Sequence, residues 1–421
     1  MKTISGGVTA PQGFTAGGIR CGVKQGMADG NQPVVSSMTD YLSGKKDLAM
    51  ILSEKECEAA AVYTMNRVKA APLYITMEHL EDGVARGIIA NSGNANACAP
   101  QGHENAKRMC EAAAQATGLK PSDFVVASTG VIGQTLNIAA IEAGVPALAK
   151  ELKKAGGSDD AAHAIMTTDT EKKEYAVTLS IGGKTVTIGA IAKGSGMIHP
   201  NMGTMLCFIT TDCAITHELL QEALHEIVPR TFNRVTVDGD TSTNDMCVVL
   251  ANGMAGNPLI EWKDDSYTLF VQALRATCEY LAKCIAGDGE GCTRLVTCTV
   301  SDARSEEAAE RLAKAVVASP LVKAAMFGAD ANWGRVLCAM GYSKAAFRPE
   351  YVDMTFASDL GEILVCKDGA GVNFDEERAK AILSRDEVEI RVDLHEGDYT
   401  VSCWGCDLTY DYVKINGDYR T

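Results

Sequence analysis

The chain has 421 residues, 46% of them hydrophobic, with 40 glycines against 11 prolines. This is enough apolar material for one large core or two ordinary ones, and the excess of glycine indicates many tight turns rather than disorder. The formal charge is −15, with 54 acidic residues against 39 Lys and Arg residues, which argues against nucleic acid or an anionic membrane as the main partner because both attract basic surfaces.

Helical and strand patterns alternate through the first half of the chain. Alanine-rich amphipathic patterns predict helices at residues 104–117, 137–155 and 159–166. Alternating patterns predict strands at residues 123–127, 175–181 and 185–192, and the Gly182-Gly183 turn joins the last two strands as a hairpin.

The second half repeats this mixture. The same patterns predict strands at residues 205–211, 234–238, 246–251, 295–301 and 352–357, with a strand-rich stretch at residues 388–413. Helices are expected after Thr216, which would cap one of them, and at residues 267–285 and 305–318. Because strand groups and helix groups are mixed and no linker separates modules, we predict an α+β fold, a layered sandwich of β-sheets covered by helices.

Cysteine usage and the absence of targeting signals favour the cytoplasm. Fifteen cysteines are an odd number scattered through a long chain, so a disulfide scaffold is not expected. Cys403 and Cys406 have the spacing of a redox pair, but they lie in a strand pattern rather than before a helix. The other cysteines are too widely spaced for a zinc ribbon, and no metal site is predicted. No apolar stretch reaches the roughly 20 residues of a membrane span, and residues 1–14 lack the apolar core of a signal peptide.

The stretch KGSGMIHPNMGTMLCF, residues 193–208, places a Gly203-Thr204 bond between a glycine-rich turn and an apolar run. A threonine hydroxyl is a poor nucleophile until a base takes its proton, and the residue's own α-amino group can do so once the chain is cut before it. Gly203 permits strained backbone angles, and the hydroxyl of Thr204 can attack its carbonyl and shift the chain from nitrogen to oxygen, after which water releases two chains. The new amino group, with a reference pKa of about 7.7 to 8.0, is partly neutral near pH 7. An arbitrary Gly-Thr pair merely opens a strand after a turn, so the surrounding residues decide the interpretation.

Those residues resemble one family along most of the chain. KGSGMIHPNMGTML resembles the self-processing segment of the ornithine acetyltransferases (glutamate N-acetyltransferases) of arginine biosynthesis, whose pattern is close to KGxGMIxPNMATML. The resemblance continues in GGVTAPQGFTAGGIRCGVK, SGNANAC, STGVIGQ and IMTTDT before that segment, and in DGDTSTND, GDGEG, GADANWGR and DLTYDYVKINGDYRT after it. The chain is identified as a member of that family. Two departures stand out: Gly203 replaces the usual alanine, and Ala99-Pro100 stands where Thr-Gly is commoner.

The resemblance implies a role for each matching position. Thr204 is the nucleophile, the bond between Gly203 and Thr204 is cleaved, and an oxyanion is stabilised by a hydroxyl and a backbone N–H from Thr129 and Gly130. Substrate is bound by Thr170, Lys193, Thr204, Glu290, Asn416 and Thr421. Lys193 can neutralise the substrate α-carboxylate, and Glu290 can pair with the ornithine ammonium. Taken alone, these two residues would be ordinary surface charges, and Ser-Thr-Gly would be an ordinary turn.

The implied reaction is ping-pong. Thr204 takes the acetyl group from N-acetylornithine, ornithine leaves, and glutamate collects the acetyl group as N-acetylglutamate. Because the acetyl group stays on the protein, no cofactor, metal or prosthetic group is required, and some members of the family also accept acetyl-CoA as donor. The family further implies that cleavage yields an α chain, residues 1–203, and a β chain, residues 204–421, which assemble as a heterotetramer of two α and two β chains.

Two other interpretations of the residues stay open. The strand pattern ending at Asp238 resembles the nucleophile loop of haloacid-dehalogenase-type phosphatases, with GDGEG as a magnesium loop and Lys283 as the cation. Those loops should surround a parallel sheet that begins near the nucleophile, whereas more than half of the chain precedes Asp238. Alternatively, a non-catalytic protein on the same fold would bind an amino acid without turnover, and replacing Thr204 would have no kinetic effect.

Overall fold

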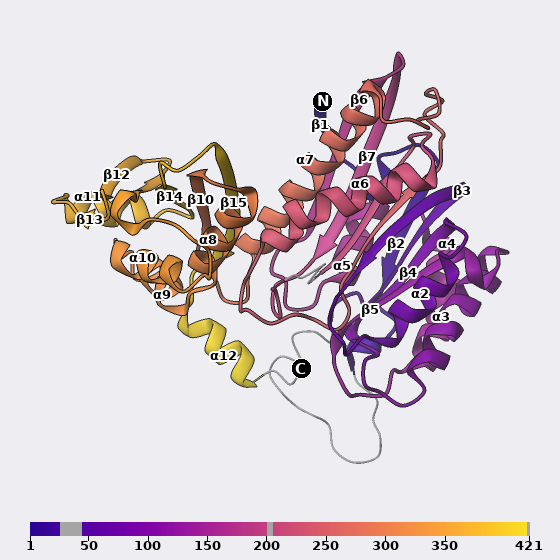
Figure 1. Cartoon of the computed structure of the whole chain (residues 1–421). Coiled ribbons are helices and arrows are strands. Elements are labelled where there is room, and N and C mark those ends of the chain that lie inside the picture. The colour runs from indigo at the N-terminus through magenta and orange to yellow at the C-terminus, as the bar shows by residue number, and fades with distance from the viewer. Residues whose placement is uncertain (26–43, 200–204, 419–421) are drawn as a thin grey trace.

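A computed structural model describes residues 1–25, 44–199 and 205–418 of the chain. The larger part is built on a nine-stranded mixed sheet with the order β1-β6-β7-β8-β9-β3-β4-β5, in which β2 also pairs with β3 (Figure 1). The strands are β1 (Lys2–Ile4), β2 (Phe14–Ile19), β3 (Leu48–Tyr63), β4 (Val84–Asn94), β5 (Phe124–Val131), β6 (Lys173–Ile181), β7 (Lys184–Lys193), β8 (Leu206–Thr211) and β9 (Met246–Ala251). β8 lies between β7 and β9, antiparallel to β7 and parallel to β9.

Strand β3 joins the two halves of this sheet. Its residues 48–52 pair with β2 and β4, whereas residues 58–63 pair with β9. The register shifts between these two segments, and an irregularity of this kind bends a strand. One buried cluster then contains Ile51 and Val125 from one half together with Phe208 from the other. The two halves therefore share a core between them.

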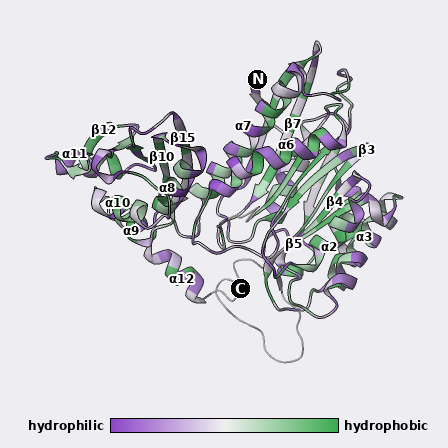
Figure 2. Cartoon of the chain, viewed as in Figure 1, coloured by the Kyte–Doolittle hydropathy of each residue, from purple (hydrophilic) through white to green (hydrophobic). Residues whose placement is uncertain are grey.

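Helices cover the outer faces of this layered sheet. α6 (His217–Arg230) and α7 (Asp265–Gly287) pack on the half that contains β6 to β9. α3 (Gly102–Thr117) and α4 (Ile138–Glu151) pack on the half that contains β3 to β5. α2 (Ala71–His79) lies against β5, whereas α5 (Gly157–Ile165) lies against β2 and β3 within the core that the two halves share. Figure 2 shows the strands as largely hydrophobic ribbons between helices with mixed surfaces.

The second body is built on a six-stranded sheet with the order β13-β12-β11-β14-β10-β15. Its strands are β10 (Leu295–Ala303), β11 (Asp353–Ser358), β12 (Gly361–Lys367), β13 (Ala370–Gly371), β14 (Glu387–Asp393) and β15 (Tyr399–Cys406). Its helices are α8 (Glu306–Ala318), α9 (Pro320–Phe327), α10 (Trp333–Gly341) and α11 (Glu376–Leu383), and they enclose a separate core with the sheet. Trp404 and Cys406 belong to the core under α7, so β15 fastens this body to the larger one. α12 (Tyr410–Asp418) then runs back toward the larger sheet (Figure 1).

The structure confirms the predicted α+β layered sandwich. Short 3-10 helices connect several elements: η1 (Gly7–Thr9), η2 (Val23–Gln25), η3 (Pro121–Asp123), η4 (Phe232–Arg234) and η5 (Pro349–Tyr351). The helices predicted at residues 104–117, 267–285 and 305–318 appear as α3, α7 and α8, within two residues at each end. Among the described residues, no helix has both the length and the apolar character needed to cross a bilayer.

Two strand predictions are wrong. Residues 234–238 follow η4 and make only an isolated bridge, from Val235 to Trp404, because their apolar side chains are buried without a neighbouring strand to complete a ladder. The strand-rich stretch predicted to reach residue 413 ends at Cys406. There the carboxylate of Asp407 accepts the backbone N–H groups of Thr293 and Arg294, which closes the ladder before α12 begins.

Replacement of Phe208 by Ala should destabilise the fold strongly. Phe208 is fully buried in the core between the two halves of the sheet, so the change leaves a cavity that costs about 3–5 kcal/mol of unfolding free energy. Leu269→Ala is the matched control, because Leu269 lies on α7 with 46% of its surface exposed and should change stability by less than about 0.5 kcal/mol. Thermal unfolding followed by circular dichroism measures both. Equal unfolding midpoints for the two variants would contradict this layering.

Candidate functional site

A small polar cavity of about 160 Å³ brings together most of the residues predicted to form the site. Its walls include Thr129, Gly130, Lys193, Glu290 and Asn416, five predicted residues from four separated segments. The remaining lining residues are Ile132, Thr167, Thr168, Gly196, Met197, Ile198, Met205, Leu206, Asp238, Asp240, Ser242, Thr243, Asn244, Asp245 and Tyr412. The cavity lies where β7 ends and where β8 and β9 begin, and the loops next to these strand ends supply most of its wall.

Three predicted residues, Gly203, Thr204 and Thr421, lie outside the described residues. Met205, which follows Thr204 in the chain, is buried and lines the cavity. Its carbonyl accepts the N–H of Met246 at 2.9 Å, which fixes the chain directly after Thr204 to the start of β9.

Thr129 and Gly130 occupy the end of β5, beside the SGNANAC segment. Gly130 has φ +131°, and a Cβ there would lie 2.3 Å from the carbonyl carbon of Gly93, so glycine is needed for the close approach of the two backbones. The side chain of Asn244 donates to the carbonyl oxygens of Ala95 and Ser128, at 2.6 and 2.8 Å. The end of β5 is therefore tied to the loop that precedes β9, and Thr129 is fixed in the cavity wall.

Lys193 is buried at the end of β7 with several polar neighbours. Its ammonium nitrogen donates to Thr167 Oγ1 at 2.8 Å and to Thr129 Oγ1 at 3.4 Å, and lies 3.8 Å from Asp169 Oδ2. Burial lowers the pKa of the Lys193 ammonium, and the charge of Asp169 opposes this effect. Lys193 is thus no free surface charge but a fixed cation in the cavity wall.

A buried cluster of alternating charges supports this lysine. The ammonium of Lys173 donates to Asp169 at 2.8 Å and to Asp288 at 2.5 Å, and Asp169 also accepts the N–H of Gly194 at 2.7 Å. Burial alone would raise the pKa of the Asp169 carboxyl, but the charges of Lys173 and Lys193 override it and hold that pKa well below its usual range. Two carboxylates and two ammonium groups therefore form a neutral set that links three segments around the site.

Thr170 does not line the cavity but belongs to this cluster. Its backbone N–H and its hydroxyl both donate to the carboxylate of Asp288. A threonine hydroxyl has one hydrogen, so Thr170 can offer a ligand only its lone pairs. It is suited to accept from an N–H group and not to bind a carboxylate.

Glu290 supplies a buried negative charge to the cavity. It is 7% exposed, and in the described part of the chain it forms no ion pair with a Lys, Arg or His. Asn416 Nδ2 donates to its Oε2 at 2.7 Å, and a Cβ on Gly196 would lie only 2.3 Å from its carboxyl carbon. Only glycine at position 196 leaves room for the Glu290 carboxylate. A cationic ligand would neutralise the buried charge of this carboxylate.

Asp245 is a second buried carboxyl in the cavity wall. It is 2% exposed, and its Oδ2 has no hydrogen-bond partner among the described residues. Burial raises the pKa of this carboxyl well above its ordinary value, although Ser242 and Thr64 oppose the effect. The folded environment thus favours the neutral form of this carboxyl, which lies directly before the strand whose Met246 N–H bonds Met205.

Asp238 holds the backbone rather than presenting a nucleophile. Its carboxylate accepts the N–H groups of Met197 at 2.6 Å, Ile198 at 2.8 Å and Asp240 at 3.1 Å. These three bonds use most of the roughly four lone-pair sites of the carboxylate, which a phosphatase would need for attack and for magnesium. The structure therefore does not support Asp238 as the nucleophile of a phosphatase.

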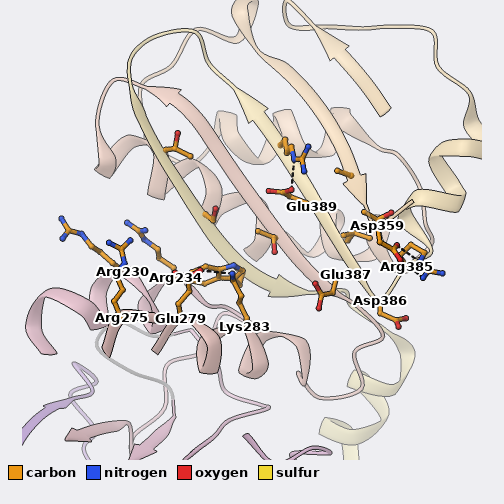
Figure 3. A pocket seen from close by; sticks show the side chains of 18 residues that line it. Arg230, Arg234, Arg275, Glu279, Lys283, Asp359, Arg385, Asp386, Glu387 and Glu389 are labelled. Carbon is orange, nitrogen blue, oxygen red and sulfur yellow. Dashed lines mark hydrogen bonds and ion pairs between the residues drawn. The ribbon is translucent and has the colours of Figure 1, made fainter. Parts of the chain in front are cut away.

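A larger cleft of about 680 Å³ lies between α7 and the face of the six-stranded sheet (Figure 3). Charged side chains line it, but neighbours already neutralise many of them: Lys283 pairs with Glu279, and Arg385 with Asp359. None of the described residues predicted to form the site lines this cleft. It is a groove of paired charges and not the predicted site.

Sequence reasoning missed four of the residues that organise the site. Asp169 and Asp288 stand inside motifs used for the resemblance, IMTTDT and GDGEG, but received no role in the acetyltransferase interpretation, and neither did Lys173 or Asp245. The spacing of Asp169 and Lys173, four residues apart, was an available signal for an ion pair. The contact of Lys173 with Asp288, more than 100 residues away, had no signal in the sequence.

The fold and the cavity define an enzyme that binds a small charged substrate within a layered α+β body. The family model described as the ArgJ family matches residues 35–421. The chain is similar to the arginine biosynthesis bifunctional protein ArgJ of Symbiobacterium thermophilum, at 52% identity over all of both chains, and to the protein of that name from Caldanaerobacter subterraneus subsp. tengcongensis, at 46% identity over all of both chains. The chain belongs to the ArgJ family, as the sequence motifs predicted.

One solved relative is ornithine acetyltransferase from Mycobacterium tuberculosis, crystallised in complex with ornithine. It is 37% identical, and the match covers 48% of this chain and 98% of the solved chain with a TM-score of 0.41. The phosphatase and non-catalytic alternatives find no support in the two ArgJ relatives.

Replacement of Asp245 by Asn should flatten the dependence of stability on pH. A carboxyl whose pKa is raised on folding binds more protons in the folded than in the unfolded chain, so its contribution falls as pH rises above the unfolded pKa of about 4. The amide cannot ionise, so the variant should gain thermal stability relative to the parent between pH 5 and pH 8. Unfolding midpoints at pH 5, 6.5 and 8 measure the gain. A deficit of the same size at all three pH values would contradict a raised pKa of Asp245 in the folded protein.

Proposed function

We propose that this chain, an N-acetyltransferase of arginine biosynthesis, moves the acetyl group of N-acetylornithine to glutamate by way of Thr204. The observation that carries the proposal is the composition of one cavity. Thr129, Lys193 and Glu290 lie far apart in the sequence, yet they line it together with Met205, the residue after Thr204. An oxyanion donor, a cation and an anion are thus gathered around the start of β8, where the predicted nucleophile precedes the strand.

Self-cleavage between Gly203 and Thr204 generates the active nucleophile. Attack of the Thr204 hydroxyl on the carbonyl of Gly203 forms an ester as the peptide C–N bond breaks, and the nitrogen becomes the free α-amine. Water hydrolyses the ester and leaves Thr204 at the start of the second chain. The support for this step is the position of the bond between β7 and β8, two paired strands of one sheet. Residues 1–203 and 204–421 would therefore stay together as α and β chains after the cut.

Acetyl transfer follows in two balanced steps. The α-amine of Thr204 takes the hydroxyl proton as Oγ bonds to the acetyl carbon, and the carbonyl oxygen becomes an oxyanion beside Thr129 and Gly130. The C–N bond to ornithine then breaks, and the proton passes to the departing amine. The amine of glutamate attacks the acetyl-Thr204 ester in the same manner and restores the hydroxyl. None of these steps needs a metal or a bound cofactor.

The charges of the cavity match the two substrates. Glu290 is buried with no cationic partner among the residues that the structure describes, which suits the side-chain ammonium of ornithine. Asn416 holds this carboxylate in place, and the lone pairs of Thr170 can accept from an amide or ammonium N–H. Lys193 provides the positive field for the substrate α-carboxylate, and Thr421 at the chain end completes the set that the resemblance implies.

We place three finer points within the same proposal. The enzyme works in the cytoplasm, two pairs of α and β chains form a heterotetramer, and acetyl-CoA serves as a second donor that yields N-acetylglutamate directly. The word bifunctional in the names of the relatives supports the second activity. Gel filtration and an assay of acetyl-CoA consumption with glutamate test the assembly and the second donor.

Thr204→Ala should abolish both cleavage and transfer. Denaturing electrophoresis of the purified parent should show two fragments, residues 1–203 and 204–421, whereas the variant should give one uncut band because alanine has no hydroxyl to attack the carbonyl. Thr210→Val is the matched control, since the hydroxyl of Thr210 donates to the carbonyl oxygens of Val8 and Gly189 and has no part in the proposed cleavage, and this variant should be cut normally. A whole, active parent chain would exclude the mechanism.

Glu290→Gln should raise the KM for N-acetylornithine by roughly tenfold to a hundredfold. The change removes the charge opposite the ornithine ammonium, and a hydrogen bond to a charged group contributes about 1.5–3 kcal/mol. The KM for glutamate should change little, because glutamate carries no side-chain ammonium. Steady-state kinetics with each substrate varied in turn measure both values, and Glu279→Gln in the other cleft is the control. Equal increases for the two substrates would show that Glu290 does not select ornithine.

A further inference from the structure

Lys193 is fixed on three sides before any substrate arrives. Its ammonium nitrogen donates to Thr167 Oγ1 at 2.8 Å and to Thr129 Oγ1 at 3.4 Å. On the third side lies the fully buried carboxylate of Asp169, 3.8 Å away, which also holds the N–H of Gly194 next in the chain. Backbone and side chain are therefore both anchored, so the cation cannot move far to meet a ligand.

The contact with Thr129 determines where the hydroxyl hydrogen of Thr129 can point. An ammonium has hydrogens but no acceptor, so Thr129 Oγ1 must accept from Lys193. Its own hydrogen then has to point elsewhere, and residues 1–25, 44–199 and 205–418 provide no acceptor for it. Thr129 lines the cavity, so that hydrogen is available to a ligand oxygen. A hydroxyl that accepts from a cation is also a stronger donor.

We propose that Lys193 is a positioning residue for the oxyanion site: through Thr129 it aims a hydroxyl hydrogen at the acetyl carbonyl oxygen and strengthens that hydrogen bond. This inference rests on the proposed function and adds a role to substrate binding. The positive charge of Lys193 favours the oxygen most when it becomes negative, in the transition state. No bond to Lys193 forms or breaks, and its proton stays in place. Asp169 and Thr167 serve this role by holding the ammonium against Thr129.

Substrate binding by Lys193 and positioning of Thr129 by Lys193 predict different kinetic effects when Lys193 is replaced. A residue that only neutralises the substrate α-carboxylate would change KM when it is replaced, and its effect would be independent of Thr129. A residue that acts through Thr129 would change kcat, and its effect would largely disappear once the hydroxyl is removed. The test is therefore a double-mutant cycle with Lys193→Met, Thr129→Val and the double variant.

The readout is the rate at which N-acetylornithine acetylates the cleaved enzyme in a single turnover. The parent is measured first, and a parent that is neither cut nor acetylated would remove the proposed function rather than this inference. Each single variant should lose up to about 10²-fold in rate, the loss typical of removing one oxyanion donor, and the double variant should lose little more than Thr129→Val alone. Losses that multiply in the double variant, or a change confined to KM, would overturn the proposal.

Lys24→Met controls for the general effect of removing a buried cation. Lys24 is buried nearby and donates to the carbonyl oxygens of Lys46 and Met166, but it has no contact with Thr129. Its replacement should slow acetylation much less than Lys193→Met does. An equal loss would mean that Lys193 acts by its distant field and not through Thr129, which also overturns the proposal.

Lys193→Arg tests the role of the positive charge if Lys193→Met does not fold or remains uncut. Arginine keeps the charge and stays protonated at every pH at which the enzyme is stable. The acetylation rate of the parent should fall at alkaline pH as Lys193 loses its proton, at a pH lowered by burial. In the arginine variant this fall should move to higher pH, with the rate at neutral pH kept within about tenfold of the parent. An alkaline profile identical to that of the parent would overturn the proposal.

Discussion

The site depends on a neutral group of four buried charges formed by Asp169, Lys173, Lys193 and Asp288. Burying a single charge is costly, so each member requires its partners, and the segments that carry them must meet. Such a cluster adds little net stability compared with an apolar core, but removing one member is expensive. It therefore acts as a geometric constraint. Thr170, Gly194 and the loop of Glu290 are all hydrogen-bonded to it or to its neighbours, and the cavity takes its shape from these bonds.

The same four buried charges also connect the two chains that the proposed cleavage would produce. Asp169, Lys173 and Lys193 precede the proposed cleavage point, whereas Asp288 follows it. The strand pair β7 and β8 crosses the same boundary, and β8 is enclosed between β7 and β9. Two new chain ends can therefore form without separation of the halves, because the sheet, the shared core and the ion cluster hold them. The proposed cleavage would then free the amine of Thr204 while the rest of the site stays assembled.

The cavity contains charged groups of opposite sign at different positions. Glu290 is an anion that lacks a cationic partner within the described ranges, and Lys193 is a cation held behind Thr129. Burial raises the pKa of the Asp245 carboxyl well above its ordinary value, which disfavours a second negative charge in the cavity wall. This arrangement fits a substrate with both charges and a reaction that creates a transient negative oxygen between them.

Local patterns in the sequence predicted the elements whose own residues determine them. The amphipathic periods of α7 and α8 and the Gly182-Gly183 turn are each readable within a short window, whereas Thr216, predicted as a cap, stands before α6 without a side-chain cap bond. Motif resemblance located Thr129, Lys193 and Glu290, which the structure then places around one cavity. The failures at residues 234–238 and 407–413 have one cause. In both stretches, alternating or apolar residues predicted a strand. Whether a strand forms depends on hydrogen bonding to a neighbouring strand, and the segments that these residues contact lie far away in the sequence. The partnership of Lys173 with Asp288 was hidden for the same reason.

Intact-mass spectrometry tests the central claim most directly, namely that Thr204 carries the acetyl group. The purified protein is incubated with N-acetylornithine in the absence of glutamate, quenched in acid and weighed as separate fragments. The fragment of residues 204–421 should gain the mass of one acetyl group, the fragment of residues 1–203 should gain none, and addition of glutamate should remove the gain. Transfer by an enzyme that never shows an acetylated fragment, or an acetyl group on any residue other than Thr204, would contradict the account.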